Sequence, residues 1–166
     1  MSHLRAGEYD EALEQARRMA ESQPDSALPW TLAALVHSAR EDESAARDAL
    51  ATALEREPAD PAARHFLARL DMQAGDMESA RSQLNAVLEK RPGHAGTLVA
   101  LANLEARAGN PARAEDRLLE AHQSDPDALR PRVLLARLRL QRGNPAGALE
   151  LLAGEDGASG VTPRHW

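Results

Sequence analysis

The reactive side chains of this sequence are not spaced as they are in an enzyme or a metal site. The chain contains no cysteine, and its six histidines include no HExxH pair. Ser38, Ser44 and Ser124 stand in no nucleophile-elbow motif, and the glycines form no phosphate-binding loop. We therefore expect no catalytic activity, no metal and no cofactor. The chemistry that remains is that of arginine, since Lys90 is the only lysine among 20 basic residues.

The charge balance and the hydropathy of the sequence argue against nucleic acids and membranes as partners. The chain carries 26 acidic residues against 20 basic ones, a formal net charge of −6. This balance disfavours nucleic acid and anionic membranes as partners. The apolar runs are far too short to cross a bilayer, so we expect no membrane insertion. No apolar stretch of a signal peptide follows the first residues, and the sequence fits the cytoplasm as well as the periplasm.

Several independent columns of residues recur with a period of 34. An apolar residue follows each alanine of the repeat by four positions, as on one face of a helix. A period of this length predicts paired helices that bury their apolar faces against neighbouring pairs. The columns are Pro24, Pro58, Pro92 and Pro126; Ala12, Ala46, Ala80, Ala114 and Ala148; and Gly7, Gly75, Gly109 and Gly143, with Glu41 in the remaining place of the glycine column.

Capping residues and glycines predict where the helices begin and end. Asp, Asn and Ser can cap the exposed backbone N–H groups of a first turn, and the glycine column permits a left-handed turn between paired helices. The candidate caps are Ser26, Asp42, Asp60, Asp76, Asn110 and Asn144. The expected helices span residues 1–6, 8–22, 27–40, 42–56, 61–74, 76–90, 95–108, 110–124, 129–142 and 144–153. We expect residues 154–166 to form a flexible tail.

One copy of the repeat is the most complete. It reads Trp30-x2-Ala33-Ala34-x2-His37, then Ala46-x3-Leu50, then Pro58. This pattern resembles the tetratricopeptide repeat. The resemblance covers residues 1–153 and implies an all-α fold, a right-handed superhelical solenoid of antiparallel helix pairs with about 4.5 repeats of 34 residues. A partial first repeat would occupy residues 1–26, followed by repeats at 27–60, 61–94, 95–128 and 129–153.

The sequence departs from the family pattern in a column that usually holds tyrosine. The residues there are His37, Asp71, Glu105 and Arg139. A second, weaker resemblance links the stretch 100–109 to the tetratricopeptide repeat lipoproteins of bacterial PEP-CTERM and exopolysaccharide export systems. This second resemblance implies a role in a bacterial cell envelope.

In a superhelix of this family, one stripe of each first helix would face a concave groove. The stripe contains no carboxylate, and its later part is rich in arginine, whose planar fork suits carboxylates. We therefore expect the groove to bind a partner polypeptide with acidic groups. Its expected partner-binding residues are Leu28, Thr31, Leu35, His65, Arg69, Met72, Gln73, Val99, Asn103, Arg107, Arg130, Arg137 and Gln141. Alternatively, Arg69 and Arg137 pair with acids of the chain itself, such as Asp71 or Glu105.

The resemblance implies a non-enzymatic protein–protein interaction scaffold, in a bacterial envelope or secretion assembly. Two other interpretations stay open: a regulatory or targeting segment of a larger multidomain enzyme, and an RNA-binding helical repeat, which the net charge disfavours. Leu149, Leu151 and Leu152 would be partly exposed at the end of the last helix, where no polar cap follows. We therefore expect either a monomeric fragment of a longer array or an end-to-end dimer.

Overall fold

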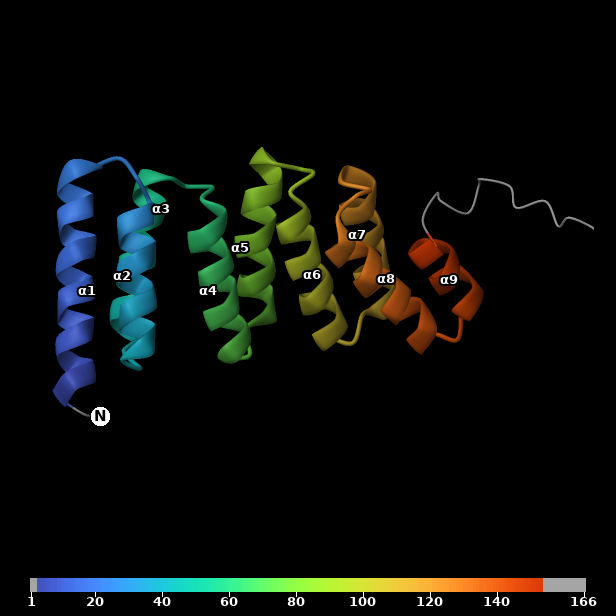
Figure 1. Cartoon of the computed structure of the whole chain (residues 1–166), viewed down its shortest axis with the longest axis horizontal. Coiled ribbons are helices and arrows are strands. Elements are labelled where there is room, and N and C mark those ends of the chain that lie inside the picture. The colour runs from blue at the N-terminus through green and yellow to red at the C-terminus, as the bar shows by residue number, and fades with distance from the viewer. Residues whose placement is uncertain (1–2, 154–166) are drawn as a thin grey trace, which may run out of the picture. The chain divides into compact units, whose positions relative to one another are not determined.

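The computed structural model of the chain describes residues 3–153, with side chains from residue 7 onward. Within that range every regular element is an α-helix. The chain divides into two compact units, residues 1–92 and residues 93–166. Inside each unit successive helices run in opposite directions and are joined by short turns (Figure 1). The predicted all-α helical repeat fold is confirmed, whereas the predicted tail at 154–166 lies outside the described residues.

The first unit contains five helices in its described part, and each packs on the next along the chain. They are α1 (His3–Ser22), α2 (Leu28–Ala39), α3 (Glu43–Arg56), α4 (Pro61–Gln73) and α5 (Met77–Lys90). The second unit has the same sequential packing between neighbouring helices of its described part. They are α6 (Ala95–Arg107), α7 (Pro111–Ser124), α8 (Leu129–Gln141) and α9 (Pro145–Ala153).

The beginning of the chain differs from the prediction. We expected one helix to end at residue 6 and another to start at residue 8, but α1 runs through Gly7 without a break. Glycine permits a left-handed turn without imposing one, and the flanking Ala6 and Glu8 are good helix formers. The other glycines of the column do take the predicted left-handed conformation, with φ of +83° at Gly75 and +78° at Gly109.

Aspartate caps begin three of the helices, as predicted. The carboxylates of Asp42, Asp60 and Asp76 accept hydrogen bonds from the backbone N–H groups three residues ahead, at 3.0, 2.7 and 3.0 Å. Bonds from Ser79 hold the pKa of Asp76 below its ordinary value. Asn144 caps α9 in the same way, through Gly147 N–H at 2.9 Å.

Two of the predicted caps behave differently. The side chain of Asn110 makes no capping bond, because its amide donates to the Glu105 carboxylate at 2.9 Å. The hydroxyl of Ser26 accepts from Leu28 N–H at 3.2 Å, yet the cap position of α2 falls on Ala27. Ser26 therefore still accepts from a backbone N–H at the start of α2, whereas a competing local hydrogen bond takes the Asn110 side chain away from the acceptor role.

Small residues make the contact between paired helices possible. Ala46, Ala80, Ala114 and Ala148 are at most 1% exposed. An alanine at a contact lets two helix axes approach closely, so the larger apolar side chains beside it can interdigitate. In the first unit these side chains form a core that includes Ala34, Ala46, Leu50, Phe66 and Leu70.

Two charged residues of the column that usually holds tyrosine, Asp71 and Arg139, form ion pairs with the preceding helix. Arg47 of α3 donates to Asp71 of α4 at 2.7 Å, and this bond raises the pKa of Arg47. Two periods later Glu115 of α7 accepts from Arg139 of α8 at 3.4 Å, with the charges exchanged. Asp71 is only 6% exposed, so its charge needs this partner. Ion pairs thus join consecutive helices where an aromatic ring would otherwise pack.

The last described helix leaves an apolar face uncovered. Leu149 is 68% exposed and Leu152 is 49% exposed, whereas Leu151 is half-buried. The partial exposure expected for the three leucines at the end of α9 is therefore found for all of them, and it is largest for Leu149.

Replacing Ala46 with phenylalanine tests the close helix contact. The larger side chain has no room at a fully buried position, so we expect the free energy of unfolding to fall by about 1–3 kcal/mol. Ala51→Phe, on the exposed side of the same helix α3, should change it by less than about 0.5 kcal/mol. Urea unfolding followed by circular dichroism measures both variants. Equal effects of the two substitutions would contradict the packing described for α3.

Glu41 is the one non-glycine residue with positive φ in the described part, at +62°. Left-handed backbone is strained for any residue with a Cβ atom, so Glu41→Gly should raise the free energy of unfolding by about 0.5–1 kcal/mol. Ala51→Gly in the middle of α3 should lower it by about 1 kcal/mol. Thermal unfolding of both variants shows whether the two changes in the free energy of unfolding have opposite signs. A destabilised Glu41→Gly protein would show that the glutamate side chain compensates the backbone strain.

Candidate functional site

The structure distributes the predicted binding residues over both units. In the first unit Leu28 and Leu35 of α2 are 49% and 46% exposed. On α4, Arg69 and Gln73 are exposed, while His65 and Met72 are half-buried. The guanidinium of Arg69 lies over the ring of Phe66, 4.3 Å from its centroid. This stacking gives Arg69 a packing role within its own helix.

Two of the predicted binding residues are buried and offer no contact surface. Thr31 is 6% exposed, and its hydroxyl donates to the carbonyl of Ala27 at 3.1 Å. Val99 is 3% exposed. The prediction used helical spacing alone. Spacing shows which residues share one face of a helix, but it does not show whether that face points to solvent or to the core. Thr31 and Val99 therefore leave the set of surface contacts.

In the second unit the structure brings three predicted residues together at one hollow. Asn103 comes from α6, and Arg137 and Gln141 come from α8. The hollow has a volume of about 210 Å³, and we call it the α6–α8 pocket. Its lining residues are Ala102, Asn103, Ala106, Ala114, Leu118, Leu134, Arg137, Leu138 and Gln141. The other predicted residues of this unit, Arg107 and Arg130, are exposed but do not line it.

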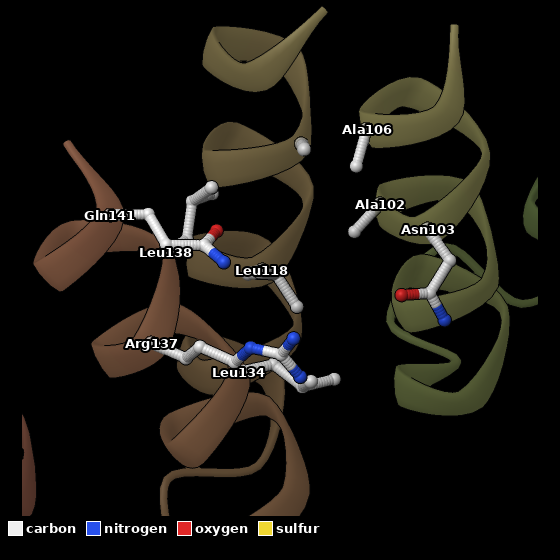
Figure 2. A pocket seen from close by; sticks show the side chains of 9 residues that line it. Ala102, Asn103, Ala106, Leu118, Leu134, Arg137, Leu138 and Gln141 are labelled. Atoms are coloured by element: carbon white, nitrogen blue, oxygen red, sulfur yellow. The ribbon is translucent and has the colours of Figure 1, made fainter. Parts of the chain in front are cut away.

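The α6–α8 pocket has an apolar floor and polar arms. Leu118 of α7 and Leu134 and Leu138 of α8 supply hydrocarbon surface, and alanines of α6 and α7 leave the space open. Arg137 and Gln141 reach from α8 toward the hollow, and Asn103 lies on its α6 side (Figure 2). Small sites commonly combine an apolar lining with a few convergent polar groups. The arrangement suits a side chain with an apolar stem and a polar end.

The charge of the α6–α8 pocket is uncompensated. No acidic residue is among those that line it. Within residues 7–153 the Arg137 side chain forms no ion pair, whereas Arg139 and Arg142 both bond Glu115. Pairing of Arg69 or Arg137 with Asp71 or Glu105 was the alternative left open by the sequence. Instead Asp71 is bound by Arg47, and Glu105 accepts a bond from Asn110. Among residues 7–153, Arg137 therefore has no acidic partner.

Apolar side chains on α8 flank the arginines. Val133 is 44% exposed and Leu140 is 53% exposed, at spacings of four and three residues on either side of Arg137. These positions share one face of the helix. Leu129 at the start of α8 is 61% exposed. The exposed face of α8 thus presents aliphatic and guanidinium groups together.

Sequence reasoning missed the floor of the pocket. Leu118, Leu134 and Leu138 read as ordinary core positions of the repeat, and nothing in their types indicates a hollow. A comparison of the columns would have shown that Leu134 stands two periods after Phe66, which is a larger residue. That difference is the one signal that could have pointed to the pocket.

Among the described residues, no group of three or more His, Cys, Asp or Glu side chains could hold a metal ion. None of the helices in that part of the chain is long and apolar enough to cross a membrane.

Comparisons with known proteins agree on the repeat. A sequence profile of the tetratricopeptide repeat matches residues 37–102 and 105–154. A comparison with curated proteins found no match.

Among solved structures, MamA from Desulfovibrio magneticus RS-1 is similar with a TM-score of 0.66 and 17% identity, over 95% of this chain and 91% of that one. PilF of Pseudomonas aeruginosa is similar with a TM-score of 0.73 and 16% identity, over 98% and 74% of the two chains. A tetratricopeptide repeat protein from Parabacteroides merdae ATCC 43184 is similar with a TM-score of 0.68 and 19% identity, over 93% and 62%. At these identities the likeness shows the fold.

A pair of neighbouring arginines tests the distinction between structural and free side chains. Arg139 donates to Glu115 and, at 3.1 Å, to the carbonyl of Gly147, so Arg139→Ala should lower the free energy of unfolding by about 1–3 kcal/mol. Arg137→Ala removes no bond within the chain and should stay within about 0.5 kcal/mol of the parent protein. Urea unfolding of both variants gives the comparison. A large loss for Arg137→Ala would assign it a structural role.

Proposed function

The chain belongs to the tetratricopeptide repeat family, and on that premise we propose that it is a protein-interaction scaffold that holds a partner polypeptide at the α6–α8 pocket. The observation that carries this proposal is that, within residues 7–153, Arg137 forms no ion pair and borders a hollow that no acidic residue lines. The proposal includes no catalytic step.

An acidic partner follows from the chemistry of the pocket. A guanidinium donates two parallel hydrogen bonds to a carboxylate, and the side-chain amides of Asn103 and Gln141 can donate further bonds beside it. The chain as a whole is acidic, so an arginine left free of internal acids is a local exception that would attract a negative segment.

The size of the pocket favours a polypeptide over a small metabolite. A volume of about 210 Å³ lies below the roughly 300–1,000 Å³ typical of small-molecule sites. One side chain of a partner would fill it, while the exposed Val133 and Leu140 of α8 would cover aliphatic side chains beside it. The partner we propose carries an acidic residue close to aliphatic ones.

The exposed predicted residues of the first unit extend this proposal. Leu28, Leu35 and Gln73 offer further contact surface on α2 and α4. Arg107 and Arg130 do the same beside the pocket in the second unit. Within each unit, these exposed residues would add contact area around a bound segment of the partner, where single contacts contribute little free energy.

We further propose that the scaffold works in a bacterial envelope or secretion assembly. The support is the resemblance of residues 100–109 to envelope lipoproteins with this repeat, together with the bacterial origin of the similar structures MamA and PilF. Fractionation of the source cell with an antibody to the chain tests this setting, and recovery with neither membranes nor periplasm would contradict it.

A charge reversal tests the binding site. Arg137→Glu should abolish capture of acidic partners because it places a carboxylate where a partner's carboxylate would lie. Arg113→Glu changes the net charge equally, but Arg113 is an exposed residue of α7 that does not line the pocket. Quantitative mass spectrometry after affinity capture from the source cell compares the two variants. We expect at least about tenfold depletion of specific partners with Arg137→Glu only, and equal capture by both would refute the site.

A further inference from the structure

The lining positions of the α6–α8 pocket have counterparts in the sequence two periods earlier, inside the first unit. Of the five buried or half-buried positions that form its apolar lining, four carry the same residue type in both places, and one differs. The pairs, each 68 positions apart, are Ala34 and Ala102, Ala46 and Ala114, Leu50 and Leu118, Leu70 and Leu138, and finally Phe66 and Leu134.

The two sets of residues differ in packing. In the first unit the five residues belong to one core cluster, and Phe66 is 6% exposed. In the second unit the corresponding residues line a hollow of about 210 Å³, and Leu134 is half-buried. A phenyl ring is larger than an isobutyl group, so residue 66 fills the space between the helices that residue 134 leaves open.

The arginine three residues after each of these positions has a different environment in the two units. Arg69 lies over the Phe66 ring, with its guanidinium 4.3 Å from the ring centroid, and its side chain is exposed. A carboxylate that meets an exposed arginine stays solvated, and such an ion pair contributes little. Arg137 borders a recess floored by leucines, where a carboxylate would be partly desolvated and its pairing correspondingly stronger.

The amide side chains beside the arginine also differ between the two units. Gln73 and Gln141 are equivalent, but Asn103 of the second unit stands where the first unit has Leu35. Only the second unit therefore surrounds its arginine with two side-chain amides. A third lining position, Ala106, stands where the first unit has Ser38. Of these differences, Leu134 and Asn103 favour an acidic side chain at the second unit.

We infer that residue 134 determines specificity: Leu134 opens the α6–α8 pocket to one aspartate or glutamate side chain of the partner, while Phe66 closes the equivalent place in the first unit. The inference rests on the proposed function and deepens it. It predicts one acidic anchor per chain, located in the second unit.

Blocked tripeptides provide the probe. Acetyl-Leu-Glu-Leu-amide carries one carboxylate, on its side chain; acetyl-Leu-Gln-Leu-amide carries none; and acetyl-Leu-Gln-Leu with a free terminus carries one on its main chain. Nitrogen-15 NMR titration of the full chain reports the arginine Nε–H groups and the backbone amides near them. In the parent protein we expect the Glu peptide to shift Arg137 and Gln141 but not Arg69, and to bind at least about tenfold more tightly than either Gln peptide.

Substitutions at the two equivalent positions complete the test. Leu134→Phe should weaken binding of the Glu peptide at least about tenfold while leaving the melting temperature unchanged or a few degrees higher, since it fills a hollow. Leu134→Met, a swap of similar volume, should retain the affinity. Phe66→Leu should create a second site, seen as new shifts at Arg69.

The outcomes separate this inference from the proposed function. Full affinity in a folded Leu134→Phe protein, equal shifts at Arg69 and Arg137 in the parent, or no response to the Glu peptide at all would each overturn the inference. Preferential binding of the peptide with a free terminus would show that the pocket recognises a main-chain carboxylate. That result would also overturn the inference. The proposed function stands or falls separately, with the partner capture by Arg137→Glu.

Discussion

The close approach of paired helices at one alanine column is the constraint on which the rest of the structure depends. Ala46, Ala80, Ala114 and Ala148 are almost completely buried, and a methyl group at each lets the neighbouring leucines interdigitate across the helix pair. Aspartate and asparagine caps and left-handed glycines then set the helix ends so that this column meets its partner helix. Because the period of 34 repeats the alanine column, each of these copies buries its alanine at the contact between paired helices.

Polar pairs take the place of aromatic rings between these helices. The pair of Arg47 with Asp71 and the reversed pair of Glu115 with Arg139 join α3 to α4 and α7 to α8. Both pairs consume charges that would otherwise be available to partners. Arg139 and Arg142 are therefore engaged by Glu115, whereas Arg137 forms no ion pair within residues 7–153.

The candidate site arises from the same packing with one side chain changed. Where Phe66 completes a core in the first unit, Leu134 leaves a hollow beside an arginine in the second. Repeat proteins can vary a single core position without losing the fold, because neighbouring contacts within each pair still supply most of the burial. In the inference drawn here, the column that contains Phe66 and Leu134 therefore affects both the packing of the helices and the recognition of a partner.

The sequence by itself determined the helical repeat, its period, most helix ends and the abundance of arginine on α8, because these follow from local spacing, capping chemistry and composition. It also indicated Asn103, Arg137 and Gln141, which lie on the predicted groove-facing stripes of α6 and α8. Tertiary structure alone decided that Thr31 and Val99 are buried, that Asn110 bonds Glu105 instead of capping, and that α1 continues through Gly7. It also decided which arginines are paired and where a hollow lies, because burial, ion pairing and empty volume depend on side chains far apart in the sequence, whose distances no local pattern specifies.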